Sequence, residues 1–182
     1  ATVKVLFGIR VYALLNASTV AAAVTLYSFM VWVPVYLIRE FGLSTREVGL
    51  KVGLCAGLAG SVGVFVSGWL TDRLSQSNYR WQLRVPAITT LLFCPLILAV
   101  IHAPTANSAF ALLVPTYMSA LAYTGPAWAV QQTVAPPNMR AIAAAILLFL
   151  VNLIGLALGP QLVGALSDHL QEPGGGTGGL RL

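Results

Sequence analysis

The chain has 182 residues, of which 58% are hydrophobic and only 8% are Asp, Glu, Lys or Arg. Soluble domains carry roughly 25% charged residues, and so few charges cannot cover the surface of a water-soluble protein. The composition therefore excludes a soluble globular fold. The basic isoelectric point of 9.6 follows from a charge bias between the two sides of a membrane, described below, and requires no nucleic-acid partner.

Five apolar segments are predicted to cross the membrane as helices, because a span needs about 20 residues and lipid offers no partner for unpaired backbone groups. In chain order they cover about residues 11–38, 48–70, 85–101, 108–134 and 141–166. The connections are short and polar, which leaves no room for another domain. We therefore expect an all-α polytopic bundle in residues 1–170. A Gly-rich loop in residues 171–182 is expected to lead to a last helix outside this chain.

The basic residues are divided unevenly between the two ends of these spans. The end that contains residues 71–84 has six basic residues against one acid: Lys4, Arg10, Arg73, Arg80, Arg84 and Arg140 against Asp72. The other end has four against four: Arg39, Arg46, Lys51 and Arg181 against Glu40, Glu47, Asp168 and Glu172. Because cytoplasmic loops are enriched in Lys and Arg, the first end is predicted to be cytoplasmic.

The first span carries a stripe of polar, small and kink-forming residues within about 80° of its surface. The stripe consists of Tyr12, Asn16, Thr19, Ala23, Tyr27, Met30 and Pro34. Leu and Val occupy much of the remaining surface, so we expect the stripe to face protein or water. Two interpretations stay open: it lines a solute cavity, or it forms hydrogen bonds between helices that contribute about 0.6 to 2 kcal/mol each.

The fourth span has a similar stripe within about 100° of its surface, made of Tyr117, Leu121, Thr124, Trp128, Gln131 and Gln132. Gly125 and Pro126 are predicted to break its hydrogen-bond ladder, which suits a moving gate. Tyr117 and Thr124 lie near the middle and are the better cavity candidates. Trp128 and the two glutamines lie toward the cytoplasmic end, where interfacial anchoring is the alternative.

Small residues dominate one face of the second and fifth spans, which predicts close approach of another helix. In the second span they are Gly49, Gly53, Gly57, Gly60, Gly63 and Ser67. In the fifth they are Ala141, Ala145, Gly155 and Gly159, joined by Asn152, which is either a functional residue or an interhelical hydrogen-bonding residue. The third span is apolar on all sides except at Thr89 and Thr90 and is expected to face lipid.

Residues Gly68 to Leu74, with the sequence GWLTDRL, are predicted to place Asp72 and Arg73 in a short turn between the second and third spans. No acid pair, metal-ligand cluster or nucleophile with a neighbouring base lies within any span, so we expect no enzyme activity, metal or cofactor. Intramembrane charges, the usual mark of an ion pathway, are missing from the middle of all five spans. A coupling carboxylate would therefore lie elsewhere.

The Gly68 to Leu74 segment, followed by Arg80, resembles the Gly-x-Leu-x-Asp-Arg signature of the major facilitator superfamily. Residues 32–39, 42–49 and 140–168 resemble the C-terminal half of its Spinster-like members. The resemblance implies helices seven to eleven of a twelve-helix transporter that works by alternating access. It also implies that Asp72 caps a helix of the other half and closes the cytoplasmic side, with Gly68 and Arg73 in the same gating motif.

Together these patterns predict part of a secondary transporter that moves a small amphipathic or lipid-like solute. The candidate cavity residues are Asn16, Thr19, Tyr27, Tyr117, Thr124 and Asn152. The expected partners are the N-terminal half of the same transporter, the lipid bilayer and a lysolipid-like solute, in a plasma or bacterial inner membrane. A drug-efflux facilitator and a non-transporting membrane scaffold are the alternatives.

Overall fold

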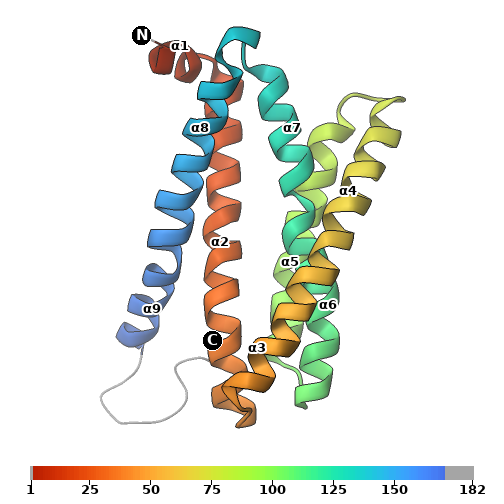
Figure 1. The fold of residues 1–182 in the computed structure, drawn as a ribbon, viewed down its shortest axis with the longest axis vertical. Coiled ribbons are helices and arrows are strands. Elements are labelled where there is room, and N and C mark those ends of the chain that lie inside the picture. The colour runs from red at the N-terminus through yellow and green to blue at the C-terminus, as the bar shows by residue number, and fades with distance from the viewer. Residues whose placement is uncertain (1, 171–182) are drawn as a thin grey trace.

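The computed structural model describes residues 2–170, and every element in that range is a helix (Figure 1). The α-helices are α1 (Thr2–Gly8), α2 (Arg10–Phe41), α3 (Thr45–Leu54), α4 (Gly60–Ser75), α5 (Trp81–Ile101), α6 (Ala106–Ala122), α7 (Thr124–Val134), α8 (Arg140–Leu150) and α9 (Gly159–Leu170). Two π-helical segments, η1 (Cys55–Ala59) and η3 (Val151–Leu158), and one 3-10 turn, η2 (Pro137–Met139), join them. The predicted loop of residues 171–182 lies outside the described residues.

Within residues 2–170, four continuous helical segments are long and apolar enough to cross a membrane: Arg10–Phe41, Thr45–Ser75, Trp81–Ile101 and Pro137–Ser167. The predicted span of residues 108–134 is instead divided at Tyr123 into α6, with 17 residues, and α7, with 11. The cause is Pro126, which has no N–H to donate to the carbonyl of Ala122. The predicted break in this helix is thus confirmed, although it falls at Tyr123, just before Gly125 and Pro126.

The long helices alternate in direction, so that their connections gather at two ends (Figure 1). One end, at the top of the figure, holds α1 and the α4–α5 and α7–α8 connections. It therefore also holds Arg10, Arg73, Arg80, Arg84 and Arg140, and we call it the basic end. The opposite end holds the α2–α3 and α5–α6 connections. This grouping of charges is the one expected from the sequence.

The Asp72 and Arg73 pair does not lie in a turn, which corrects the sequence-based expectation. Both residues belong to α4, which continues to Ser75, and the turn to α5 follows at residues 76–80. The turn forms there because short polar residues close it: the Asn78 side-chain oxygen accepts a hydrogen bond from the Arg80 backbone N–H at 3.0 Å. The motif is therefore presented on a rigid helical surface.

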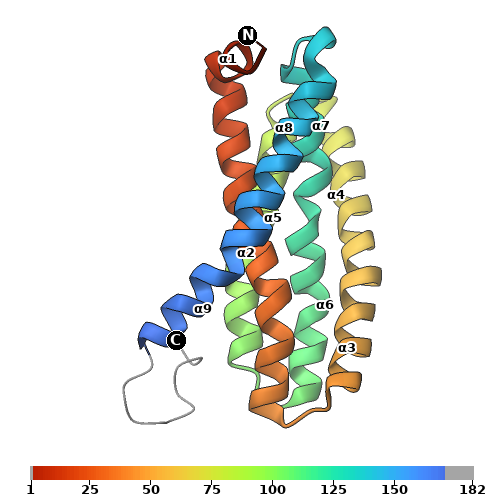
Figure 2. The ribbon, with the colours of Figure 1, turned by 60° about the vertical axis from the view of Figure 1, so that its left-hand side comes forward.

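Helix α2 lies between two groups of helices, with α8 and α9 on one side and α4 to α7 on the other (Figure 1). Its apolar core with the second group includes Phe29, whose ring packs edge-on against Phe93 and Tyr117, both at 5.2 Å between centroids. On the other side α9 diverges from the α5–α6 pair, as Figure 2 shows. The short helix α1 was not predicted; it runs across the basic end, where Leu6 is fully buried against Tyr12 and Ala143.

The π-helical segments divide both faces of small residues that a regular helix would keep aligned. A π turn contains more residues than an α turn and so rotates the positions that follow it. As a result Gly49, Gly53 and Gly57 have open space beside them, whereas Gly60 and Gly63 are buried against α6. In the other helix, Gly155 and Gly159 are buried against α2 while Asn152 is exposed. The two continuous faces predicted from 100° spacing are therefore wrong.

Helix α5 was expected to face lipid, and the structure shows one exposed side and one side that packs against other helices. Val85, Phe93 and Val100 are buried toward α6 and its neighbours. The Ser119 hydroxyl of α6 donates to the Thr89 carbonyl of α5 at 2.6 Å. Because Thr89 and Thr90 direct their own hydroxyls to the Pro86 carbonyl, they add no polar surface toward lipid.

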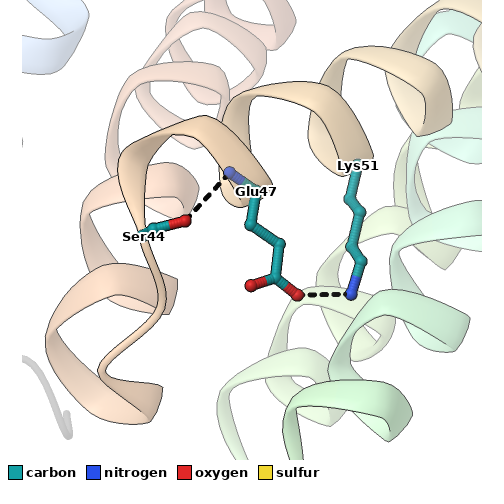
Figure 3. A network of polar contacts seen from close by, with 3 residues as sticks. All are labelled: Ser44, Glu47 and Lys51. Atoms are coloured by element: carbon teal, nitrogen blue, oxygen red, sulfur yellow. Dashed lines mark hydrogen bonds and ion pairs between the residues drawn. The ribbon is translucent and has the colours of Figure 1, made fainter.

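Helix α3 begins at the opposite end with a capped first turn (Figure 3). The Ser44 hydroxyl accepts a hydrogen bond from the Glu47 backbone N–H at 3.3 Å, and Lys51 forms an ion pair with Glu47 at 2.7 Å. Lys51 also lies over the Phe110 ring at 4.7 Å. The helix cap, the i,i+4 ion pair and the cation–π contact thus stabilise the first turns of α3 and give Glu47 and Lys51 partners.

Candidate functional site

Asn16, a predicted cavity residue, forms part of a buried polar network between α2, α7 and α8. Its side-chain oxygen accepts a hydrogen bond from Gln131 at 2.9 Å, and its amide donates to the Tyr12 carbonyl at 2.9 Å. The Tyr12 hydroxyl in turn donates to the Ala143 carbonyl at 3.1 Å. Asn16 and Gln131 are each 2% exposed. This geometry supports the interhelical interpretation of the stripe at this level.

Gln131 was interpreted from the sequence as a possible interfacial anchor, and its burial corrects that interpretation. The amide is drawn inward because Asn16 offers an acceptor in an otherwise apolar contact. Its own side-chain oxygen is buried without a hydrogen-bond partner among the described residues. Trp128, on the same helix, is 39% exposed and fits the anchoring alternative.

Thr19 and Tyr117 are also buried between helices of this chain, at 4% and 1% exposure. Tyr117 packs its ring against Phe29. Neither residue lines the groove described below. Their place as cavity residues remains a prediction, and their surroundings favour a packing role.

The other three candidates are more accessible. Tyr27 is half-buried on α2 and lies against Gly155, and Thr124 is half-buried at the start of α7. Asn152 is exposed on η3, with its amide donating to the Leu148 carbonyl at 2.7 Å. The Asn152 amide and the Thr124 hydroxyl each donate to a carbonyl three or four residues earlier, and Tyr27 lies beside a glycine. These accessible side chains can therefore face a solute without burying an unpaired donor.

A groove of about 460 Å³ lies between α2, α5 and α9, and none of the six predicted cavity residues lines it. Its walls are mainly apolar, with Phe29, Val33 and Ile97 among them, and its polar groups come from Thr25, Ser28, Trp32, Tyr36 and Ser167. The Ser28 hydroxyl is buried and makes no hydrogen bond in the described chain. The Trp32 indole donates to the Pro160 carbonyl at 3.0 Å and joins α2 to α9 across this groove.

A signal for this groove was present in the sequence. Thr25, Ser28, Trp32 and Tyr36 recur at helical spacing and form a second polar and aromatic stripe on α2, offset from the first. Tyr36 also donates to the Ile101 carbonyl at 2.8 Å and so satisfies a backbone group at the end of α5.

The predicted gating motif lies on the last two turns of α4. Asp72 and Arg73 are exposed, and neither forms an ion pair within residues 2–170. Arg73 lies over the Trp69 ring at 5.4 Å. Apart from its chain neighbours and the backbone of its own helix, no atom lies within 4 Å of the position that a Cβ of residue Gly68 would take. A close-packing role for Gly68 therefore has no partner in the described part of this chain.

Ser67, directly before the motif, connects α4 to the break between α6 and α7. Its hydroxyl donates to the Ala122 carbonyl at 2.5 Å. That carbonyl lacks its usual intrahelical donor because residue 126 is proline, and a neighbouring hydroxyl is one of the groups that repair such breaks in membranes. Sequence reasoning placed Ser67 only among small packing residues. The hydrogen bond links the motif helix to the candidate gate.

Comparison with known proteins places these features in a family. The model of the Major Facilitator Superfamily matches residues 2–160. An MFS-type efflux pump of Mycolicibacterium smegmatis is 33% identical over 146 residues, which cover 80% of this chain and 34% of the pump. A D-galactonate transporter of Escherichia coli is 28% identical over 155 residues and is likewise covered over 34% of its length. The chain thus spans about a third of these relatives.

Solved structures show the same architecture. A bacterial homologue of the human lysosomal transporter Spinster, in an inward-facing and occupied conformation, matches with a TM-score of 0.75 and 25% identity over 87% of this chain and 34% of its own. Its inward-facing and unoccupied conformation matches with a TM-score of 0.80 and 22% identity over 93% of this chain and 35% of its own. The Spinster resemblance predicted from the sequence is confirmed. This integral membrane chain belongs to the Major Facilitator Superfamily.

Proposed function

We propose that this chain is part of a secondary transporter that moves a small amphipathic or lipid-like solute by alternating access, in a plasma or bacterial inner membrane. Family membership carries the transport part of the proposal. The groove between α2, α5 and α9, apolar along its walls with scattered hydroxyl and indole groups, supports an amphipathic solute.

The charge distribution also favours an amphipathic solute over a sugar acid. The relatives include a D-galactonate transporter and a hexuronate transporter, and a buried carboxylate requires a cationic partner. No Lys or Arg lies in residues 11–38, 52–70, 85–101, 103–139 or 141–167. A sugar acid would thus depend on a cation supplied from outside this chain.

A drug-efflux facilitator is the second candidate, because the M. smegmatis relative is an efflux pump. Both candidates place the exposed α4 face, with Gly68 and Asp72, against the N-terminal half of the transporter. There Asp72 would cap the positive end of a helix dipole, an attraction of about 0.3 to 2 kcal/mol. The exposed carboxylate and the open space beside Gly68 support this placement.

The test is solute flux in proteoliposomes that contain the full-length protein, with labelled lysophosphatidylcholine as the probe. We expect flux in the native protein and a loss of roughly tenfold or more in Asp72→Ala. A tenfold loss corresponds to about 1.4 kcal/mol less stabilisation of the conformation that is closed at the cytoplasmic side. Glu47→Gln at the opposite end is the matched control and should transport normally. Equal flux in Asp72→Ala and native protein would remove the gating role.

Competition then separates the two candidates. Inhibition of flux by lysolipids of different headgroup, but not by small cationic drugs, supports a lipid-like solute. Inhibition by the drugs alone supports drug efflux. Protein that assembles into complexes but moves neither probe would instead favour the membrane scaffold and overturn the proposal.

A further inference from the structure

The outer face of α5 combines two arginines with a long apolar surface. Arg80, Arg84, Ile88, Leu91, Pro95 and Leu98 follow at intervals of three or four residues, which places them on one side of the helix. All six are exposed, whereas Val85, Phe93 and Val100 on the other side are buried. The exposed side therefore has a cationic top and an apolar length below it, the arrangement that an anionic phospholipid would match.

Within residues 2–170 the two arginines are not neutralised by an acidic side chain. Neither Arg80 nor Arg84 forms an ion pair in the part of the chain that the structure describes, and Asp72 is the one acidic residue between Glu47 and Asp168. Like charges four residues apart on a helix destabilise each other. The first turn of α5 also contains no acidic residue. An external anion would relieve this repulsion.

Aromatic side chains fix the arrangement at the level of the headgroups. The Arg84 guanidinium lies over the Trp81 ring at 5.5 Å, which orients its donors. Tyr79, in the turn just before, is 62% exposed. Trp and Tyr gather where the hydrocarbon ends, so these rings place the arginines beside lipid phosphates. Below them Ile88, Leu91 and Leu98 are 47%, 72% and 56% exposed and can only be covered favourably by apolar groups.

We propose that the outer face of α5 binds an anionic phospholipid, with its phosphate on Arg80 and Arg84 and its acyl chains along Ile88, Leu91 and Leu98. The guanidinium groups supply several donors to the phosphate oxygens, a geometry that arginine forms better than lysine. The lipid headgroup is attracted from the leaflet that faces the basic end, and the acyl chains distinguish it from free phosphate.

The experiment is native mass spectrometry of the full-length protein released from micelles that contain phosphatidylcholine and phosphatidylglycerol. The native protein should retain phosphatidylglycerol preferentially. Arg80→Gln with Arg84→Gln should weaken that retention by roughly 10- to 30-fold, since each basic residue near an anionic surface contributes about a fivefold preference. The control, Arg39→Gln with Arg46→Gln, removes two exposed arginines from the opposite end and should leave retention unchanged.

Three outcomes would overturn the proposal. The first is equal phosphatidylglycerol retention by the Arg80/Arg84 variant and the native protein, or an equal loss in the control. The second is competition by inorganic phosphate as effective as that by the lipid. The third is a fall in melting temperature of the variant in phosphatidylcholine alone, which would show that the arginines pair with protein groups of the other half. Because the readout is lipid retention, it is independent of solute flux.

Discussion

The two long helices that contain π segments, α3–η1–α4 and α8–η3–α9, differ in how they are held. After η1, Gly63 lies so close to α6 that an added Cβ would overlap the Met118 carbonyl oxygen and lie 2.7 Å from its Cα. After η3, the Cβ of an alanine at Gly159 would lie 2.9 Å from the Val24 carbonyl oxygen and 3.1 Å from the Ser28 hydroxyl. The first contact is backbone on backbone, and the second is looser and partly with a side chain.

The difference separates a fixed pair of helices from one that has room to move. Helix α4 is further tied to the α6–α7 break by the Ser67 hydrogen bond, whereas α9 is joined to α2 through the Trp32 indole and borders the 460 Å³ groove. Packed backbones resist displacement because interiors leave few voids. We expect α4 to resist displacement from α6 more strongly than α9 resists displacement from α2.

Gly63→Ala should produce the largest loss of stability, because neither backbone at the contact can move without displacing its helix. We expect a decrease of about 2 to 3 kcal/mol in the free energy of unfolding of the full-length protein, the upper part of the range for overpacking. Unfolding by SDS in mixed micelles measures it. The matched control is Gly60→Ala, where the added methyl meets the flexible end of Leu121. Equal losses in both variants would contradict the backbone contact.

Gly159→Ala should cost less, about 1 to 2 kcal/mol, since the Ser28 hydroxyl can rotate away and α9 can shift outward. The same unfolding measurement applies, with Gly53→Ala as the control because that position has open space around it. A larger loss of stability in Gly159→Ala than in Gly63→Ala would show that α9 is held against α2 more tightly than α4 is held against α6.

Sequence patterns predicted the helical class, the charge bias and the break near Pro126, because these depend on composition and on local backbone chemistry. They failed where the helix departs from 100° per residue. The π segments turn Gly49, Gly53 and Gly57 away from Gly63, and no residue type predicts such a segment. Sequence patterns also do not decide what a polar residue on a span contacts, as Asn16 and Gln131 show. Such a residue predicts a polar partner, but whether this partner is a solute or a neighbouring helix depends on tertiary packing.

Ser67→Ala tests the link between α4 and the α6–α7 break. Loss of the Ser67 hydroxyl leaves the Ala122 carbonyl without this donor in an apolar contact. We therefore expect a decrease of about 1 kcal/mol in the free energy of unfolding. Ser61→Ala is the control, because the Ser61 hydroxyl is exposed and bonds only to the Gly57 carbonyl of its own helix. A loss as large in Ser61→Ala would show that the hydroxyls matter through helix propensity and not through the break.

Asn152→Ala should have the smallest effect on stability, within about 0.5 kcal/mol, since the side chain is exposed and its hydrogen bond stays within one helix. Its effect on transport is therefore informative. If Asn152 faces the solute, flux of the labelled lysolipid in proteoliposomes should fall severalfold although the protein unfolds as the native form does. Unchanged flux would assign Asn152 to the lipid-facing or interdomain surface. Tyr27 on α2 and Thr124 at the start of α7 would then be left as the accessible cavity candidates.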